Sequence, residues 1–417
     1  MLRSLAAALL FTAAPAAAAD DLAEAREILA EQPVFDGHND LPYGIRENDG
    51  RIGDFPYARL DDRYAGKLVT DAAGMKAGGV GAQFWSVYVP ASLPQPEAAV
   101  QTLEQIDMAK RLIAANPDSL ALAATAEDVR RIMASGKVAG MFGVEGGYSI
   151  ANSLGVLRQF YDLGVRYMTL THSQSLDWAD SATDAPKAGG LSEFGREVVH
   201  EMNRLGMLVD LSHTAPATMR QAIAESAAPV IFSHSSTRGV ANHARNVPDD
   251  VLAMLPQNGG VVMITFVESF LSEDRRQWGG EQAAYEARMR ALEPGLSEDE
   301  IAKRMTDWEA KNPAPKASVE DAADHVDYAR KIAGIDHIGI GSDFDGVTSY
   351  PSGLTGPADY PNLFAELLRR GYSAEDLKKI SSGNVLRVLE QAEQVAARLQ
   401  GERGPSEMRF SAEAAAR

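Results

Sequence analysis

Residues Met141-Phe142-Gly143-Val144-Glu145-Gly146-Gly147 form a short apolar run with alternating glycines that ends near a single carboxylate. Such a run predicts a buried strand. A buried carboxylate needs a compensating positive charge, because an isolated one in apolar surroundings costs many kcal/mol. No Lys or Arg stands among the ten residues after Glu145. Taken alone, Glu145 fits equally well as a helix cap just past a strand, so its role depends on what ends the other strands.

Seven other segments share the character of residues 138–145, because each is apolar or β-branched and ends near a polar residue. The eight segments are 34–40, 81–89, 138–145, 166–172, 207–213, 230–234, 260–266 and 337–343. Stretches of helical period separate most of them, such as 97–115, 192–205 and 319–332. This alternation predicts parallel strands joined by crossover helices. Eight such units predict an α/β protein with a single (β/α)₈ barrel, like the TIM barrel, with its chemistry at the C-terminal ends of the strands.

A doubly wound open sheet is the alternative fold, but no Gly-rich phosphate-binding fingerprint follows the first strand. One helical insertion, residues 269–315, falls between strands 7 and 8 and is too long for an ordinary βα loop. It could cover the barrel mouth or contact another subunit, and the sequence leaves both open. Residues 20–400 are therefore expected to form one barrel hydrolase domain, and residues 401–417 a flexible tail.

The first nineteen residues have the pattern of a signal peptide. Arg3 supplies the positive charge, residues 5–11 the apolar segment, and Ala17-Ala18-Ala19 the small-residue cleavage site. The apolar segment is too short for a convincing membrane span. We therefore expect an exported, periplasmic protein without a stable membrane anchor. The chain has no Cys, which excludes disulfides, a lipid-modified N-terminal cysteine and thiolate metal ligands.

The net charge of the chain limits the kinds of partner that it can bind. The formal net charge is -18 and the sequence pI is about 4.9. Nucleic acids and anionic membrane surfaces both attract basic proteins, so this acidity argues against either partner.

Ionisable residues stand at the ends of six of the eight predicted strands. They are His38, Asp40, Glu145, His172, His213, His234 and Asp343. Each has an ordinary structural explanation by itself, such as a hydrogen-bonded core histidine or an acid that caps a turn. Seven such residues at one level of one barrel are an improbable coincidence. The remaining histidines, His200, His243, His325 and His337, are expected to be structural.

Five of these residues suit a pair of metal ions. His38, Asp40, Glu145, His213 and His234 offer three imidazoles and two carboxylates, which favour Zn²⁺ and also fit Mn²⁺ or Co²⁺. A catalytic zinc normally takes three protein ligands, so five ligands suit two ions if Glu145 bridges them. His38 and Asp40 would hold one ion, and His213 and His234 the other. A water clamped between the ions would become the hydroxide nucleophile of a hydrolase.

Three further residues are predicted to act on the substrate. Asp343 is left without a metal role and suits proton transfer to a leaving amine. His172 is placed to stabilise a developing oxyanion. Arg245, in the loop after strand 6, could grip a substrate carboxylate with both arms of its guanidinium.

The motifs around these residues resemble the membrane (renal) dipeptidase family over about residues 34–390. They are Asp36-Gly37-His38-Asn39-Asp40-Leu41-Pro42, Gly143-Val144-Glu145-Gly146-Gly147, Thr169-Leu170-Thr171-His172, Asp210-Leu211-Ser212-His213, Phe232-Ser233-His234-Ser235, Arg245-Asn246-Val247-Pro248-Asp249-Asp250 and Gly341-Ser342-Asp343-Phe344-Asp345-Gly346-Val347. The resemblance implies a barrel with two zinc ions that hydrolyses dipeptides. It implies the same five metal ligands, with His172 and Arg245 as substrate contacts and Asp343 as proton shuttle.

The chain departs from that family in two respects. The mammalian members are disulfide-linked dimers with a C-terminal lipid anchor, and a chain without Cys or an apolar C-terminal tail cannot inherit either feature. Whether it forms a homodimer stays open. In addition, Tyr148 stands where those members have a His, which is expected to alter the rim of the pocket.

Two other functions are alternatives to a dipeptidase that cleaves L-L or L-D substrates. Another amidohydrolase-type barrel, such as a deaminase or lactonase, typically carries His-x-His on its first strand and often a bridging Lys. Here the first strand offers His38 and Asp40, and the bridge is Glu145. An exported peptide-binding protein is the other alternative, but it would not need five metal ligands and a spare acid.

Overall fold

Eight parallel strands close into a ring. The computed structural model describes residues 13–49 and 68–411. The ring runs β1–β2–β4–β5–β6–β7–β8–β9 and returns to β1, with every pairing parallel. The strands are β1 (Val34–Asn39), β2 (Val80–Ser86), β4 (Val138–Glu145), β5 (Val165–Thr169), β6 (Leu208–Asp210), β7 (Ile231–Phe232), β8 (Val261–Ile264) and β9 (Ile338–Ile340). The predicted (β/α)₈ barrel is thus confirmed.

A ninth strand lies outside the ring. The strand β3 (Leu120–Leu122) pairs with the start of β4, on the edge that β5 occupies further along. It is only three residues long and Leu122 is exposed. Three residues are too few to show a strand period, so the sequence gives no signal for β3.

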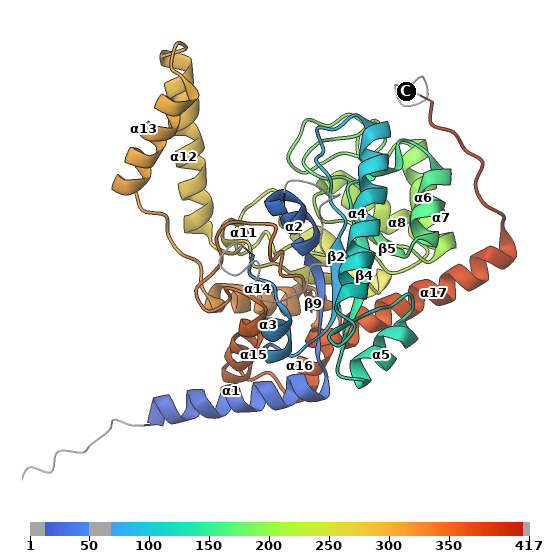
Figure 1. Cartoon of the computed structure of the whole chain (residues 1–417), viewed down its shortest axis with the longest axis horizontal. Coiled ribbons are helices and arrows are strands. Elements are labelled where there is room, and N and C mark those ends of the chain that lie inside the picture. The colour runs from blue at the N-terminus through green and yellow to red at the C-terminus, as the bar shows by residue number, and fades with distance from the viewer. Residues whose placement is uncertain (1–12, 50–67, 412–417) are drawn as a thin grey trace, which may run out of the picture.

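Helices surround the barrel (Figure 1). The longer ones are α1 (Ala13–Glu31), α4 (Gln95–Ala115), α5 (Ala126–Ala134), α6 (Leu154–Asp162), α7 (Glu193–Leu205), α8 (Pro216–Glu225), α14 (Val319–Ala333), α15 (Tyr360–Arg369) and α17 (Asn384–Glu402). Shorter helices are α2 (Leu41–Asp49), α3 (Ala72–Ala77), α9 (Asp249–Leu252), α10 (Leu255–Asn258) and α16 (Ala374–Lys378). Polar caps define several starts: Ser192 accepts from Gly195 N, and Ser318 forms a capping box with Asp321.

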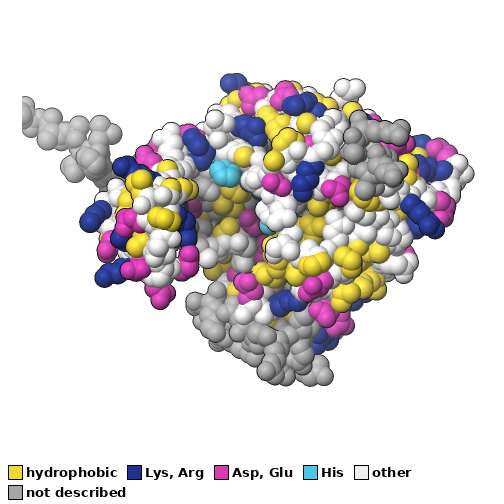
Figure 2. Space-filling view, turned by 90° about the horizontal axis from the view of Figure 1, so that it is seen from above, with side chains coloured by type: hydrophobic (Ala, Val, Ile, Leu, Met, Phe, Trp, Pro, Cys, Tyr) yellow, Lys and Arg dark blue, Asp and Glu magenta, His cyan; other side chains and the backbone are white. Residues whose placement is uncertain are grey.

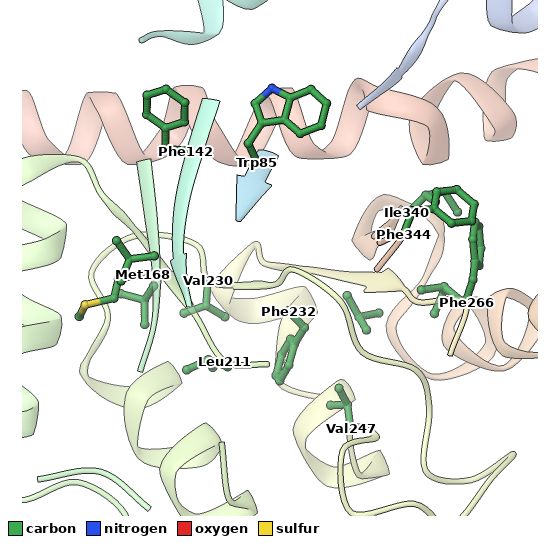
Figure 3. Packing of buried hydrophobic residues seen from close by; sticks show 14 of the residues in the cluster. Trp85, Phe142, Met168, Leu211, Val230, Phe232, Val247, Phe266, Ile340 and Phe344 are labelled. Carbon is green, nitrogen blue, oxygen red and sulfur yellow. The ribbon is translucent and has the colours of Figure 1, made fainter. Parts of the chain in front are cut away.

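Strand alternation divides the core into two clusters. Phe84 in β2 belongs to a cluster with Phe35 and Tyr167, whose rings stack and meet edge-to-face within the ring of strands. The next residue, Trp85, belongs to the larger cluster between the strands and the helices, together with Phe142. Figure 3 shows Trp85, Phe142 and other members of this larger cluster around the strands. Tyr167 links the rings of the first cluster to the predicted site, because its hydroxyl lies 2.7 Å from His38 Nδ1.

The predicted insertion lies between β8 and β9, the seventh and eighth strands of the ring, and is a helical hairpin. It comprises α11 (Glu268–Leu271), α12 (Glu273–Leu292) and α13 (Glu298–Lys311). The two long helices stand off from the barrel (Figure 1). Trp278 and Trp308 pack with ring centroids 5.6 Å apart, and Trp278 donates a hydrogen bond to the Asn312 carbonyl. Only Met289 and Ile301 are buried in these two helices, so the hairpin holds together mainly through its own contacts.

The two ends of the chain contain the predicted signal peptide and the predicted flexible tail. Residues 1–12 of the predicted signal peptide lie outside the described residues, and α1 begins within the rest of that segment, at Ala13. Residues 403–411, expected to be a flexible tail, contact α6 and α7: Arg158 donates to the Ser406 carbonyl, and Phe410 meets Phe194 edge-to-face. In the described part of the chain, no helix is long and apolar enough to cross a membrane.

Candidate active site

The polar residues of the predicted site converge at the C-terminal ends of the strands. His38 lies within β1, Asp40 directly follows it, and Glu145 is the last residue of β4. The other members follow their strands in loops, which corrects the predicted segments 166–172, 207–213, 230–234 and 337–343. His213 and Asp343 have φ values of +66° and +65°. Non-glycine residues rarely adopt this conformation, and each of the two stands three residues after its strand has ended, at Asp210 and at Ile340.

Glu145 lies at the centre of the cluster. Its Oε2 is 3.4 Å from His38 Nε2, and its Oε1 is 2.9 Å from His213 Nε2 and 3.3 Å from His234 Nε2. Asp40 Oδ2 is 3.1 Å from His38 Nε2. One oxygen of Glu145 therefore faces His38, which also contacts Asp40, and the other oxygen faces His213 and His234.

These donors fit metal ions. His213 Nε2 and His234 Nε2 lie 2.9 Å apart, and both point at a carboxylate oxygen. Asp40 Oδ1 is buried without a hydrogen-bond partner among the described residues. Three sets of ligand atoms lie within 4.8 Å of one another: His38–Glu145–His234, Glu145–His172–His213 and His38–Asp40–Asp343. Clustered imidazole and carboxylate donors of this kind suit divalent cations, zinc in particular.

The pKa values of Glu145, His213 and His234 favour the protonation states that bind cations. Burial alone would raise the pKa of Glu145, but His38, His213 and His234 outweigh it and hold that pKa well below its usual range. Burial holds the pKa values of His213 and His234 well below normal, with further contributions from Arg245 and nearby histidines. Ionised Glu145 and the neutral imidazoles of His213 and His234 are the forms that bind metal. His38 differs: burial lowers its pKa, but Tyr167, Glu145 and Asp40 outweigh burial and hold that pKa well above normal, so His38 would release a proton when a cation binds.

Asp343 has the opposite tendency to that of Glu145. Burial is the main cause that raises the pKa of Asp343, to about 8. The negative charges of Asp40 and Glu145 raise this pKa further, whereas the positive charges of His38 and Arg245 lower it. Its Oδ1 lies 3.8 Å from His38 Nε2. A carboxyl group in this setting can hold a proton near neutral pH.

The predicted substrate residues line the same cavity. This cavity has a volume of about 310 Å³ and is lined by Asp40, Tyr43, Glu47, Tyr88, Glu145, His172, His213, Arg245, Phe270, Asp343, Asp345, Gly346 and Val347. Figure 2 looks onto this side of the molecule and shows a hollow between the hairpin and the barrel. His172 Nε2 lies 3.7 Å from Glu145 Oε1, and its ring packs against Tyr88.

Among the described residues that line the cavity, Arg245 is the only Arg or Lys. It is 4% exposed, and it donates weakly to the His234 carbonyl and to Ser235 Oγ. Its guanidinium lies 5.3 Å from the centroid of the Phe270 ring. Burial is the main reason that its pKa falls to about 10. The group stays charged at neutral pH and is available to an anion that enters the cavity.

The sequence analysis missed several lining residues. Tyr88 stands next to the end of the predicted segment 81–89, and Asp345 stands in the Asp343 motif, so both had a signal in the sequence. Tyr43, Glu47 and Phe270 gave no such signal, because they follow strands at irregular distances on α2 and α11.

Tyr148 does not lie at the pocket rim as expected. It is buried and is not among the residues that line the cavity. Its hydroxyl reaches the carbonyls of Val89 and Glu145, at 2.6 Å and 3.0 Å. Tyr148 therefore links the loop after β2 to the end of β4 through its hydroxyl group, and its buried ring lies outside the cavity.

Comparisons with known proteins agree with this geometry. The family model described as Membrane dipeptidase (Peptidase family M19) matches residues 22–403. Dipeptidase verJ of Clonostachys rogersoniana is 42% identical over 393 residues, which cover 91% of this chain and 89% of that protein. The crystal structure of the probable dipeptidase PvdM from Pseudomonas aeruginosa has a TM-score of 0.78 and 25% identity, and the match covers 91% of this chain and 100% of that chain.

A second solved structure is described with a ligand. It is a metallo peptidase from Rhodobacter sphaeroides liganded with a phosphinate mimic of the dipeptide L-Ala-D-Ala, with a TM-score of 0.70 and 26% identity; the match covers 87% of this chain and 99% of that chain. The family match spans every strand of the ring and every predicted site residue from His38 to Asp343. The chain belongs to the membrane dipeptidase family, peptidase family M19.

Proposed function

We propose that this chain hydrolyses dipeptides with two zinc ions held by His38, Asp40, Glu145, His213 and His234. The observation that carries the proposal is the position of Glu145, whose two oxygens face different groups of imidazoles, at 3.4 Å from His38 and 2.9 Å from His213. A carboxylate that bridges two cations requires this arrangement. Membership of the family supports peptidase chemistry, and the imidazole and carboxylate donors support zinc.

The residues of this chain have distinct roles in the proposed reaction. Two zinc ions held by these five ligands would supply a hydroxide nucleophile at neutral pH and would polarise the scissile carbonyl. His172, at the cavity wall, donates a hydrogen bond to the carbonyl oxygen as negative charge develops there. Asp343 takes the proton of the nucleophile on a carboxylate oxygen and passes it to the leaving amine. Its buried carboxyl group lies beside the proposed ligands, with Oδ1 3.8 Å from His38 Nε2.

Arg245 explains why the substrate is a dipeptide. Its buried guanidinium binds the free C-terminal carboxylate, which sets the scissile bond one residue away, near Glu145. The free amine then lies among the carboxylates of Asp40 and Asp343. A tripeptide cannot satisfy both ends, because its carboxylate lies one residue further from the scissile bond.

A substrate series tests this proposal. One dipeptide, its C-terminal amide and the matching tripeptide are compared on the native protein, on Arg245→Ala and on Arg245→Lys. We expect the native protein to prefer the dipeptide strongly and Arg245→Ala to lose that preference. An ammonium cannot make the two-pronged contact, so Arg245→Lys should also be impaired. Arg220→Ala is the control, because Arg220 pairs with Asp250 outside the cavity. Equal native rates on all three substrates would contradict the role of Arg245.

The stereochemistry of the substrate is tested with a panel of L-L and L-D dipeptides. The ligand of the Rhodobacter sphaeroides relative mimics L-Ala-D-Ala, which supports including L-D substrates. Release of free amino acid is measured before and after chelation, and we expect chelation to abolish it. A lactonase or deaminase would turn over its own substrates and leave the panel untouched. A peptide-binding protein would bind dipeptides without releasing amino acids.

We also propose that the protein is exported to the periplasm. The support is the pattern of Arg3, the apolar residues 5–11 and the alanines before Asp20. N-terminal sequencing of the protein from fractionated bacterial cells tests it: the mature chain should come from the periplasmic fraction and begin near Asp20.

A further inference from the structure

Two buried aspartates lie behind the proposed metal site, one behind each half. Asp36 stands two residues before His38, and Asp210 three residues before His213. Both side chains are fully buried. Each accepts hydrogen bonds from two backbone N–H groups and two hydroxyl groups. None of the roles assigned above includes either residue.

Asp210 is linked to both histidines of one half-site. Its Oδ1 accepts from the backbone N–H of Ser212, which precedes His213, at 3.1 Å and from that of Ser233, which precedes His234, at 2.8 Å. Its Oδ2 accepts from Ser233 Oγ at 2.7 Å and Thr169 Oγ1 at 2.5 Å. A single carboxylate therefore joins the ends of β5, β6 and β7.

The hydroxyl of Ser233 transmits the effect of Asp210 to the imidazole of His234. Ser233 Oγ lies 2.8 Å from His234 Nδ1. Because the Ser233 proton is directed at Asp210, the serine oxygen must accept a hydrogen from Nδ1. His234 Nε2 is then unprotonated, and this is the nitrogen that points at Glu145 Oε1. Partners of this kind fix the tautomer and orientation of metal-binding histidines.

Asp36 serves as the comparison because it is linked only to the other half. Its Oδ1 accepts from the backbone N–H of His38 at 3.0 Å and of Ser342, next to Asp343, at 2.9 Å. Its Oδ2 accepts from Ser342 Oγ and from Tyr360. The Nδ1 of His38 has a different partner, the hydroxyl of Tyr167 at 2.7 Å. Asp36 therefore has no direct hydrogen bond to His213, His234 or Ser233.

We propose that Asp210 is a positioning residue that, through Ser233, holds His234 in the tautomer that binds metal and so governs the half-site of His213 and His234. Asp36 holds the backbone of the other half-site. This proposal rests on the proposed two-zinc site. Loss of a partner that orients a metal ligand typically lowers metal affinity about 10–100-fold. The loss should therefore fall on one of two ions, and on a different ion for each aspartate.

The test is a zinc titration of the metal-free full-length chain. Asp210→Asn and Ser233→Ala should each bind one equivalent as tightly as the native protein and the second about 10–100-fold more weakly. Ser235→Ala is the matched control, because Ser235 Oγ contacts Arg245 and Ser212 and no ligand imidazole. It should bind both equivalents normally. Native affinity for both ions in Ser233→Ala would overturn the proposal.

Double variants identify which ion is lost. Adding Asp210→Asn to His213→Ala should cause little further loss, since both act on the same half-site, whereas adding Asp36→Asn should weaken the remaining ion. If both aspartate variants weaken the two ions equally, in step with a fall in melting temperature, their role is merely structural and the proposal fails.

A spectroscopic measurement separates this proposal from the two-zinc proposal. In metal-free protein labelled with ¹⁵N-histidine, His234 should carry its proton on Nδ1 in the native chain and lose that preference in Ser233→Ala. A native chain that binds only one zinc would contradict the two-ion site, yet this tautomer shift would still support the link from Asp210 to His234. An unchanged tautomer in Ser233→Ala would overturn that link whatever the zinc count.

Discussion

Glu145 is the residue on which both halves of the site depend, because its two oxygens face His38 on one side and His213 and His234 on the other. Glu145→Gln replaces one of these oxygens with an amide NH₂ group, which cannot bind a cation. We expect Glu145→Gln to weaken both zinc ions and His213→Ala to weaken mainly one. Zinc analysis by mass spectrometry after reconstitution checks this. If Glu145→Gln keeps one ion at native affinity, Glu145 does not bridge.

Asp343 should separate metal binding from turnover. An amide cannot relay a proton, so Asp343→Asn should lower the turnover number about 10²–10⁴-fold, the usual contribution of a general acid–base group. The five proposed ligands are unchanged, so two zinc ions should remain. Turnover of a dipeptide and zinc content are measured on the same preparation. Near-native turnover with full zinc would assign the proton transfer to another group.

At the scale of the elements, His325 joins α14 to two segments beside the site. Its Nδ1 accepts from the backbone N–H of Thr237, and its Nε2 donates to the carbonyl of Leu271. Only a neutral imidazole can make both bonds. Burial is the main cause that lowers the pKa of His325, to about 4, against the opposing effects of the Leu271 carbonyl and Asp324.

This depressed pKa predicts acid sensitivity. The unfolded chain binds a proton on His325 below a pH of about 6.5, but the folded chain binds it only near the lowered pKa. The stabilisation is therefore complete above pH 6.5 and is lost as the pH falls towards 4, at about 1.4 kcal/mol per pH unit. Urea unfolding of the metal-free protein should show a shallower pH dependence in His325→Gln than in the native chain. Parallel curves for the two proteins would contradict the assignment.

The elements also show where sequence reasoning succeeds. The eight barrel strands were predicted because apolar runs alternate with long helical stretches, and that pattern follows from burial on both faces. The predicted ends of β2 and of β5 to β9 fall two or three residues too late, because turns at residues such as His213 and Asp343 depend on tertiary contacts that leave no local pattern. The predicted site residues do come together. The sequence gives no role to Asp210 or Tyr167, because a buried Asp or Tyr within a strand resembles any core position. Their hydrogen bonds to Ser233 and His38 are visible only in the structure.

For the whole molecule, the barrel and the α12–α13 hairpin should be stabilised independently. The barrel has a large buried core, whereas only Met289 and Ile301 are buried in the two hairpin helices. The middle of α12 also contains Gly279 and Gly280, and a Cβ at either position would meet no atom within 4 Å. Glycine within a helix costs about 0.5–1 kcal/mol relative to alanine.

The double variant Gly279→Ala/Gly280→Ala tests this independence. It should stabilise α12 by about 1–2 kcal/mol and slow amide hydrogen exchange in Glu273–Leu292, while the melting temperature of the barrel and dipeptide turnover stay unchanged. Gly206→Ala is the control: Gly206 ends α7 with a φ of +85°, so alanine there should lower the melting temperature of the barrel. A rise in barrel melting temperature in the double variant would show that the hairpin and the barrel unfold together. A fall in turnover would show instead that bending of α12 assists catalysis.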